Sequence, residues 1–493
     1  MTYFPIKKNI LYKTVIVAYM LVLLLLYAIN GFSQTMGVWD VYSFGAKGDG
    51  KIPDTQAIQM AIDDCYRAGG GKVLLHNGQF LSGTIHLKSQ VTLHVASGAT
   101  LLGSNSPVDY PLTSTQYMST SGDYLIDRTL IFAEGAENIA ITGNGIINGN
   151  GDELDTMEKP RPHIIHFRYC KHVKVRNIHL YNAAFWVQKY QSCENLLIDG
   201  ITVDSRENKN IEQARFIDVP GGRNTDGCNI VDCRNVRIAN CTINSGDDGI
   251  VLKSFAQPEG CYNITVTNCV ISTNASGIKI GTESTGEFKD ICINNCTVYN
   301  TRGAAIGLMT VDGAAMERII VSNITLLNIK GAALFLRIGN RGKIYRKADK
   351  KPGLGTMKNI LIQNIYGSEI ERYGCSITGI NNSPLENISI RNVCLTFKGG
   401  DKPLFFEGYE GRIVEELTVD NVPEMEDSYP RSEMFGKLPA YGFYVRHVNG
   451  IEFNNIKLQC KEEDKRPALV TDDVQNLFIV DFQADTTSRC KTF

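Results

Sequence analysis

The sequence of 493 residues predicts an all-β fold: a single-domain, right-handed parallel β-helix with a short N-terminal capping helix. A short phrase, Asn-apolar-x-apolar-x-Asn, returns along the chain at intervals of about 28 residues, which indicates a solenoid. Inside each phrase β-branched and polar residues alternate with the period of a β-strand. No apolar pattern of helical length separates one phrase from the next, which argues against a barrel or a doubly wound sheet.

The N-terminus predicts export. Lys7, Lys8 and Lys13 precede an uninterrupted apolar run, Val15–Ile29, and small residues follow it. This layout is typical of a secretory signal peptide, because the run is shorter than the about 20 residues of a membrane-spanning helix. We expect residues 1–33 to be a signal peptide, with an uncleaved anchor as the alternative. Residues 34–493 would then form the exported domain, periplasmic or extracellular, without a stable membrane anchor.

Composition argues against two classes of partner. The chain has 50 basic and 52 acidic side chains, and the segment 1–33 contributes three lysines and no acid, so the remainder has a net charge of −5. This balance predicts neither nucleic-acid binding nor adsorption to a membrane surface. A chain of about 460 residues would usually form two or more domains, but a repeat architecture grows lengthwise around one core. One domain is therefore compatible with this length.

Residues 53–71 predict a helix that covers the open end of the solenoid, within an N-terminal cap of about residues 40–110. Asp54 occupies the N-cap position, and the glycines after Ala68 end the helix. Apolar residues recur at helical spacing on one face: Ala57, Ile58, Ala61, Ile62 and Cys65. We expect this face to cover the first coil.

Cysteine and asparagine recur inside the repeated phrase. Cys241, Cys269 and Cys296 follow one another at the spacing of the phrase, and an asparagine precedes each of them. Because parallel strands stack at about 4.8 Å, like residues of successive coils form ladders. We expect the thiols to form a buried stack of small apolar side chains rather than disulfides, and the asparagines to bond amide to amide.

Three aspartates recur at the spacing of one coil. Asp247 and Asp248 follow Asp226 by slightly less than the usual interval, so Asp226 and Asp247 are expected at a similar point of neighbouring coils. Adjacent strand residues face opposite ways, so both members of the pair reach one cleft only if the backbone turns. The flanking glycines, Gly246 and Gly249, permit that turn.

A cluster of three carboxylates predicts acid/base chemistry. Like charges raise one another's pKa, so one carboxyl keeps its proton while the others stay charged. Hydrolysis of a glycosidic bond requires this division, an acid for the departing oxygen and a base for water. The alternative is that both motifs are solvated turns, since Asp, Asn and Gly are ordinary turn residues.

Four motifs together resemble one family. The sequence has "VYSFGAKGDG" (41–50), "NTDG" (224–227), "GDD" (246–248) and "SGIKIGTES" (276–284). These segments are similar to those of the polygalacturonase family, glycoside hydrolase family 28. The resemblance implies a pectin-lyase-like right-handed parallel β-helix and inverting hydrolysis of α-linked galacturonate bonds in pectin, without a metal or another cofactor.

The resemblance also implies roles for the acids. Asp247 would be the general acid, while Asp226 and Asp248 would together position and deprotonate the water. Asn224, in the "NTDG" motif, is expected to bind substrate. The partner would be a pectic polysaccharide or oligosaccharide.

Two departures from the family pattern concern the substrate. Ser276 stands where the family has the histidine of Gly-His-Gly, and residues 307–309 read Gly-Leu-Met where it has Arg-Ile-Lys. The family's two cations for a substrate carboxylate are therefore missing. The rhamnogalacturonan-hydrolase-like branch also lacks that histidine, which favours rhamnogalacturonan or another substituted pectin over polygalacturonan.

Other cations are expected to replace the missing pair. Lys253, Lys279 and Arg337 alternate with aliphatic residues of their strands, so they face outward if the aliphatic set faces the core. We expect them at comparable positions of their coils, with Met309 on the intervening coil. A column of cations beside the acids suits an anionic sugar chain. The alternative is that they are scattered, solvated side chains.

Two further segments could line the cleft. The basic loop 340–351 would form a positively charged lip, or only a solvated loop. Phe185 and Trp186 would stack on sugars, or only pack in the wall. Four histidines precede the acids without metal-ligand spacing (His163, His166, His172 and His179), and no role is assigned to them.

Two other functions fit the same fold. A pectate-lyase-type enzyme cleaves by β-elimination, but the three acids favour hydrolysis. A non-catalytic glycan-binding solenoid would explain the missing histidine as decay of an active site.

Overall fold

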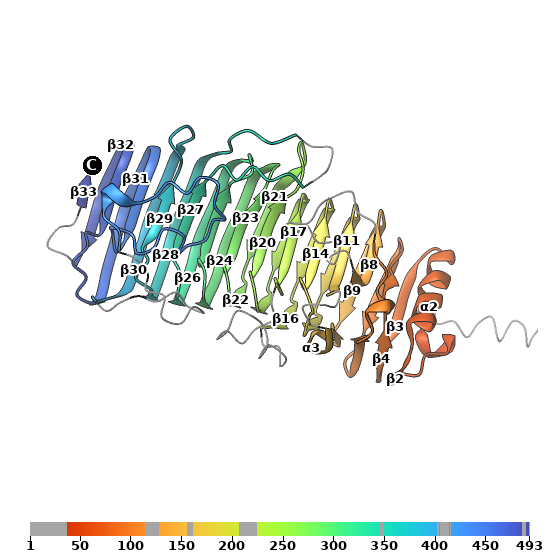
Figure 1. Ribbon diagram of the computed structural model, residues 1–493. Helices are drawn as coiled ribbons and strands as arrows, with labels where there is room; N and C mark the ends of the chain where they lie inside the picture. Colours follow the sequence, from red (N-terminus) through yellow and green to blue (C-terminus); the bar gives the residue numbers. More distant parts are fainter. Residues whose placement is uncertain are drawn as a thin grey trace, which may run out of the picture.

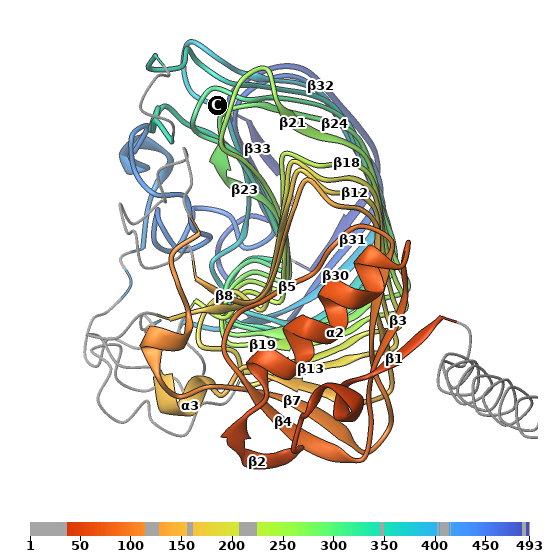
Figure 2. The same ribbon diagram turned by 90° about the vertical axis from the view of Figure 1, so that its right-hand side faces the viewer.

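The computed structural model describes residues 37–113, 128–154, 161–206, 224–345, 350–401, 404, 414, 416–485 and 490–492. Its 33 strands join side by side into one continuous wound sheet, and every pair of named strands with a given register is parallel. Figure 1 shows the coils stacked along one axis, and Figure 2 looks along that axis. The predicted parallel β-helix is confirmed. The predicted signal peptide, residues 1–33, lies outside the described residues.

Each coil contributes to three stacks of strands. The first stack carries the candidate site and is called the site sheet. Its strands are β5 (Ile85–His86), β8 (Thr129–Glu134), β11 (His163–Arg168), β14 (Gln188–Gln191), β17 (Cys228–Val231), β20 (Ile250–Ser254), β23 (Ile278–Ser284), β25 (Ile306–Thr310), β27 (Leu334–Ile338) and β29 (Cys375–Thr378), then the first residues of β31 (Phe443–Glu462) and β32 (Leu469–Ala484), and β33 (Cys490–Thr492).

The second stack begins with β1 (Val38–Asp40), β3 (Gly71–Leu75), β6 (Val91–Val95), β9 (Glu137–Gly143), β12 (Lys171–Arg176), β15 (Glu194–Asp199), β18 (Arg234–Ala239) and β21 (Gly260–Thr267). The third stack has β2 (Asp49–Pro53), β4 (Gly78–Ser82), β7 (Ala99–Gly103), β10 (Ile146–Asn148), β13 (His179–Tyr181), β16 (Thr202–Ser205), β19 (Thr242–Ser245) and β22 (Val270–Thr273). Further along, β24 (Glu287–Thr301), β26 (Ala315–Ile329), β28 (Thr356–Ile370) and β30 (Leu385–Gly399) run through both stacks.

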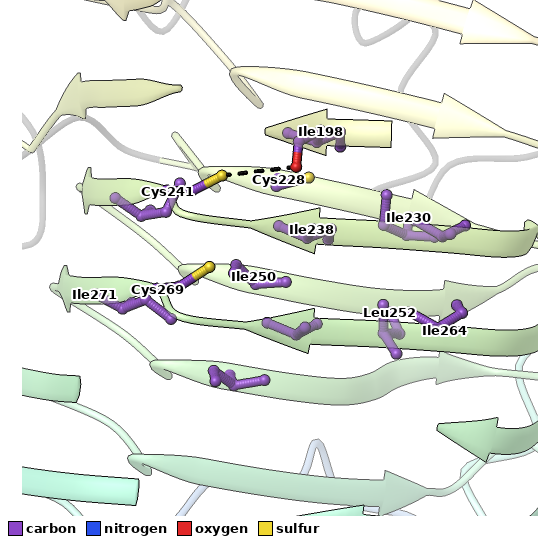
Figure 3. Close-up of a cluster of buried hydrophobic side chains, with 14 of the residues drawn as sticks. Ile198, Cys228, Ile230, Ile238, Cys241, Ile250, Leu252, Ile264, Cys269 and Ile271 are labelled. Carbon is purple, nitrogen blue, oxygen red and sulfur yellow. Dashed lines mark hydrogen bonds between the residues drawn. The ribbon is translucent and has the colours of Figure 1, made fainter. Parts of the chain in front are cut away.

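The core is one apolar column inside the coils. Alternate residues of each strand face it, as Ile250 and Leu252 do in β20, while Val251 and Lys253 face outward. The cysteines whose side chains are described are all free. Figure 3 shows Cys241 and Cys269 at corresponding places of successive coils, both buried, as predicted.

The asparagine ladder is present, with one interruption. Asn268 donates to the Oδ1 of Asn240 at 2.6 Å, and a second run continues from Asn323, whose amide donates to Asn295 at 3.2 Å. Between Asn268 and Asn295 the contact is instead the Asn268 backbone N–H with the carbonyl oxygen of residue 294, at 3.3 Å. The ladder residues have a left-handed φ, for example +59° at Asn240, which asparagine tolerates well. The coils of the ladder therefore turn at asparagines, and outside the interruption these asparagines also bond to their neighbours.

The capping helix is α2 (Thr55–Arg67), and it lies across the first coil in Figure 2. All five predicted apolar residues of its inner face are buried. The Asp54 carboxylate, however, does not cap the helix. It accepts hydrogen bonds from the backbone N–H groups of Lys47 and Gly48, at 2.6 and 3.0 Å, so it fixes the preceding loop instead.

The other helices within the described residues are short: α3 (Gly151–Leu154) and the 3₁₀ turns η1 (Val41–Phe44), η2 (Pro107–Asp109) and η5 (Val419–Asn421). In the part of the chain that the structure describes, no helix is long and apolar enough to cross a membrane. One long connection matters for the site. Residues 416–442, here called the strap, lie between β30 and β31 and pack outside the coil, against the site sheet.

Candidate active site

The acids lie in the turns that lead into the site sheet. The backbone N–H of Gly227 donates to the carbonyl of Asp248, and the N–H of Gly249 donates to the carbonyl of Ser276. Together with the register of β17 and β20, these bonds place Asp226, Asp248 and Ser276 at the same position of three successive coils. Asp226 and Asp247 therefore lie at a similar point of neighbouring coils, as expected, with an offset of one residue. Asp247 precedes the level of Asp226, and all three acids still lie on two adjacent coils.

Two of the acids each contact a lysine. The Nζ of Lys253 lies 3.3 Å from Oδ2 of Asp226, and the Nζ of Lys279 lies 2.8 Å from Oδ2 of Asp248. All four residues are at most 5% exposed. The other oxygen of Asp248 accepts the backbone N–H of Ser276 at 2.9 Å. Both lysines therefore lie beside the acids and are paired with them, and the charge of Lys253 favours the ionised form of Asp226.

Asp247 is held differently. It is only partly buried, and its carboxylate accepts the amide of Asn224 at 3.3 Å and the backbone N–H of Asp248 at 2.9 Å. Asn224 in turn accepts a hydrogen bond from Arg161 at 3.0 Å. Among the described ion pairs, none involves Asp247. Asp247 is thus the most accessible of the three acids and is held by amide groups rather than by a lysine.

The environment makes two of these acids hard to ionise. Burial raises the pKa of Asp226 to about 8, although the charge of Lys253 opposes this shift. Burial and the neighbouring charge of Asp248 raise the pKa of Asp247 to about 6. The cluster therefore holds a proton near neutral pH, shared between Asp226 and Asp247.

A fourth acid, missed in the sequence, completes the cluster. Oε2 of Glu283 lies 3.1 Å from the Nζ of Lys253, so this lysine bridges Glu283 and Asp226. Burial of Glu283 is outweighed by the charges of Lys253 and Arg341, which lower its pKa to about 2. The ring of Trp186 lies against the same ammonium, 3.9 Å from its centroid. The only available signal was the place of Glu283 in the phrase "SGIKIGTES".

The profile of "Glycosyl hydrolases family 28" matches residues 73–406, more than half of the chain. The chain belongs to this family. It is 32% identical to a probable polygalacturonase of Vitis vinifera over 43% of each chain, and 41% identical to the exo-poly-alpha-D-galacturonosidase of Dickeya chrysanthemi over 23% of this chain and 20% of that protein. These matches span less than half the length of the curated relatives.

Solved structures support the fold. The family 28 exopolygalacturonase of Yersinia enterocolitica superposes with a TM-score of 0.65 at 18% identity, covering 89% of this chain and 78% of that chain. The exopolygalacturonase of Thermotoga maritima superposes with a TM-score of 0.60 at 22% identity, covering 75% of this chain and 89% of that chain. At these identities the likeness concerns the fold.

The predicted column of cations is not a column. Arg337 is level with Met309, as expected, but Lys279 is level with Gly307. Lys253 comes two residues after Val251, the residue level with Lys279. The reason is the spacing of these residues: the coils are in register at 28 residues here, whereas 26 residues separate Lys253 from Lys279 and 30 separate Lys279 from Met309.

Arg337 is not brought to the acids. Its guanidinium is buried and donates to the backbone carbonyls of Gly379 and Glu424, at 3.0 and 2.5 Å. Glu424 belongs to the strap, so the described contacts of Arg337 fasten the strap to the sheet. Met309, in the segment where the family has Arg-Ile-Lys, is also buried against the strap, in an apolar cluster with Phe335 and Phe435.

The basic loop is tied down at its start. Arg341 donates to the buried carboxylate of Asp312 at 2.9 and 2.5 Å, and the Tyr345 hydroxyl donates to it at 2.8 Å. Residues 346–349 lie outside the described residues. Tyr345 also stacks on Phe255, with ring centroids 5.1 Å apart. The first half of the loop is therefore part of the wall rather than a freely solvated segment.

The aromatic pair also belongs to the wall. Phe185 and Trp186 stack on each other with centroids 5.4 Å apart, and both are almost fully buried. This favours the packing role over a sugar platform. Nδ1 of His163 lies 3.1 Å from the carbonyl oxygen of Trp186, which fixes the turn before β14. Within the described residues, no group of His, Cys, Asp and Glu is arranged to hold a metal ion.

Proposed function

We propose that this protein is an exported glycoside hydrolase that cleaves α-glycosidic bonds of galacturonate-containing pectic polysaccharide. The observation that carries the proposal is the arrangement of three acids on two coils, two of them paired with lysines and the third accessible. Membership of family 28 and the polygalacturonase names of the relatives support it. No step of the proposed reaction requires a cofactor.

In the proposed mechanism Asp247 is the general acid. The proton that the cluster holds can be delivered from Asp247 because this side chain is the accessible one, and Asn224 orients it. Asp248, which is paired with Lys279, accepts the proton of the attacking water, and Asp226, which is paired with Lys253, helps to position that water. Water attacks the sugar carbon as the protonated oxygen leaves, so the configuration at that carbon inverts.

Galacturonan is the first substrate to test, because the relatives named above act on it by name. Rhamnogalacturonan is the second candidate, because the segment 307–309 offers no cation and Met309 is buried under the strap. Parallel incubation with both polymers, followed by sizing of the products, separates the two. An ultraviolet-absorbing unsaturated uronide among the products would instead indicate β-elimination.

The decisive variant is Asp247→Asn, with Asp204→Asn on β16 as the matched control. We expect the first variant to unfold like the wild type but to lose about 10²–10⁴-fold in kcat, the range for loss of a general acid. Wild-type turnover in Asp247→Asn would remove this residue from the mechanism. Inactivity of the wild type on every pectin tested would favour the glycan-binding solenoid.

Export is the other untested part of the proposal. The N-terminal layout supports it, since a short basic segment precedes the apolar run Val15–Ile29. N-terminal sequencing of the protein recovered from the periplasm or the medium should find a start just after Ser33. A protein that keeps residues 1–33 and stays with the membrane fraction would support the anchor instead.

A further inference from the structure

The acids lie between two apolar clusters that cover the site sheet. Backbone hydrogen bonds set the column of turn residues as Trp186, Asp226, Asp248, Ser276 and Ala304. The first and last members are buried and apolar, whereas the three between them carry the polar side chains. At about 4.8 Å per coil, the polar part spans only about 10 Å along the axis.

The cluster on the N-terminal side is built around Trp186. It consists of Phe185, Trp186, Val231, Phe255, Ala256 and Tyr345. Phe185 and Trp186 precede β14 and so cover the coil on the N-terminal side of Asp226. The other members lie at the far ends of strands on the coils of the acids (Val231, Phe255 and Ala256) or after β27 (Tyr345). Arg161 lies over the ring of Phe185, 4.7 Å from its centroid. A saccharide continuing along the sheet on this side would have to displace these buried rings.

The cluster on the C-terminal side is formed by the strap. Its members are Ala304, Met309, Ala332, Phe335, Leu417, Val422, Phe435, Leu438, Ala440, Tyr444 and Val470. Outward residues of β25, β27 and β31 are thus covered by strap residues. Figure 2 shows this segment outside the coil, on the side of β8 and β23.

The strap is fastened by charges as well as by packing. Arg446 contacts the carboxylate of Glu424 at 2.5 Å and donates to the carbonyl of Val422 at 2.8 Å. Nε2 of His447 lies 3.1 Å from the same Glu424 carboxylate, and Arg337 holds the Glu424 carbonyl. Several independent contacts therefore hold this cover on the sheet.

One residue of the strap, Tyr429, reaches the lysine that is paired with Asp248. The hydroxyl of Tyr429 lies 3.4 Å from the Nζ of Lys279, the lysine paired with Asp248. The Tyr429 ring also lies 5.8 Å from the guanidinium carbon of Arg341. Tyr429 is 49% exposed, so one side of it is available to a ligand. The strap thus ends at the rim of the site.

We infer that the site is a pocket closed along the β-helix axis, which accepts the end of a polysaccharide chain and not its interior. An internal bond reaches the acids only if the chain continues past both of its sides, and buried clusters occupy the sheet on both sides. When the end of a polysaccharide chain is bound, the rest of the chain leaves the site in one direction only, away from the sheet. The inference rests on the proposed function and specifies how that function acts on a polymer.

The test uses the full chain on long galacturonan, with viscosity and reducing ends measured together. Release of single or paired uronides from the first time points, with reducing ends rising while viscosity stays almost constant, is the expected result. A rapid fall in viscosity with a ladder of intermediate oligomers would overturn the inference while leaving the hydrolase proposal intact. No hydrolysis of any pectin would overturn the proposed function, and the inference with it.

A pair of variants links the result to the strap. Tyr429→Ala opens the rim beside Lys279, and we expect it to lower the share of monomer among early products about twofold. Tyr366→Ala is the matched control, because Tyr366 is 63% exposed on β28 and has no place in either cluster. Identical product profiles of both variants and the wild type would show that this edge of the strap does not shape the site.

Discussion

Replacing Glu283 by glutamine tests the ion pair between this residue and Lys253, the lysine that also contacts Asp226. Glu283 is buried, and its Oε2 lies 3.1 Å from the Nζ of Lys253. The charges of Lys253 and Arg341 outweigh the effect of burial and lower its pKa from 4.5 to about 2. Glutamine keeps the shape of the side chain and removes the charge, so the variant isolates the electrostatic contribution.

The lowered pKa fixes the sign of the effect. A carboxyl that ionises more easily in the folded than in the unfolded protein stabilises the fold at pH values above its unfolded pKa. This stabilisation is lost as the pH falls from about 4.5 towards about 2. A pKa lowered by this amount corresponds to roughly 3 kcal/mol at pH 6, and to roughly half of that at pH 3.

Urea unfolding of wild type and Glu283→Gln at pH 6 and pH 3 measures both values. We expect the variant to lose about 3 kcal/mol at pH 6 and about half of that at pH 3. Glu287→Gln is the matched control, because this glutamate pairs with Lys289 at 2.8 Å but its side chain is 40% exposed. An exposed pair contributes at most about 1 kcal/mol. A loss in Glu283→Gln that is equal at both pH values, or no larger than the control, would refute the reasoning.

Three further outcomes are expected. Since burial and Asp248 raise the pKa of Asp247 to about 6, kcat should fall about tenfold per pH unit above that value, and a flat pH–rate profile up to pH 8 would contradict its role as acid. Lys279→Met removes the counter-ion 2.8 Å from Asp248, so kcat should fall more than KM rises, and an effect on KM alone would indicate a substrate-binding lysine. Asn323→Ala removes the hydrogen bonds to Asn295 and Asn364 and puts alanine at a φ of +57°, so the free energy of unfolding should fall by about 1–3 kcal/mol in thermal unfolding. An unchanged free energy of unfolding would argue that the ladder does not stabilise the fold.

The fold could be predicted because each coil repeats the same local chemistry. A strand of alternating residues followed by asparagine recurs often enough to predict the length of one coil. The coil length then predicts which residues stack on one another, as the buried Cys241 and Cys269 show. The capping helix was predictable because its inner face has helical spacing. The role of Asp54 was not, because the sequence does not reveal that the preceding loop passes within reach of its carboxylate.

The site could be predicted only in part. Asp226, Asp247 and Asp248 were identified correctly as one cluster, but their levels depend on the length of each turn, which the sequence does not specify to one residue. The strap was missed because it contains no repeated phrase, although the long interval before β31 was a signal of an insertion. Arg337 was predicted to bind substrate because its strand pattern places it on the outer face of the sheet. The strap buries its guanidinium there, and the strap could not be predicted.

The buried lysines explain how the cluster can act as an acid at all. Four carboxylates face two ammonium groups, because Lys253 contacts Glu283 and Asp226 while Lys279 contacts Asp248. Burial makes a further uncompensated charge costly, so the excess is relieved by a proton. The charges of Lys253 and Arg341 lower the pKa of Glu283, whereas burial raises the pKa values of Asp226 and Asp247, so these two acids hold that proton. A cation placed beside Asp247 would lower the pKa of this carboxyl, and the site would then be less able to give a proton to the departing oxygen.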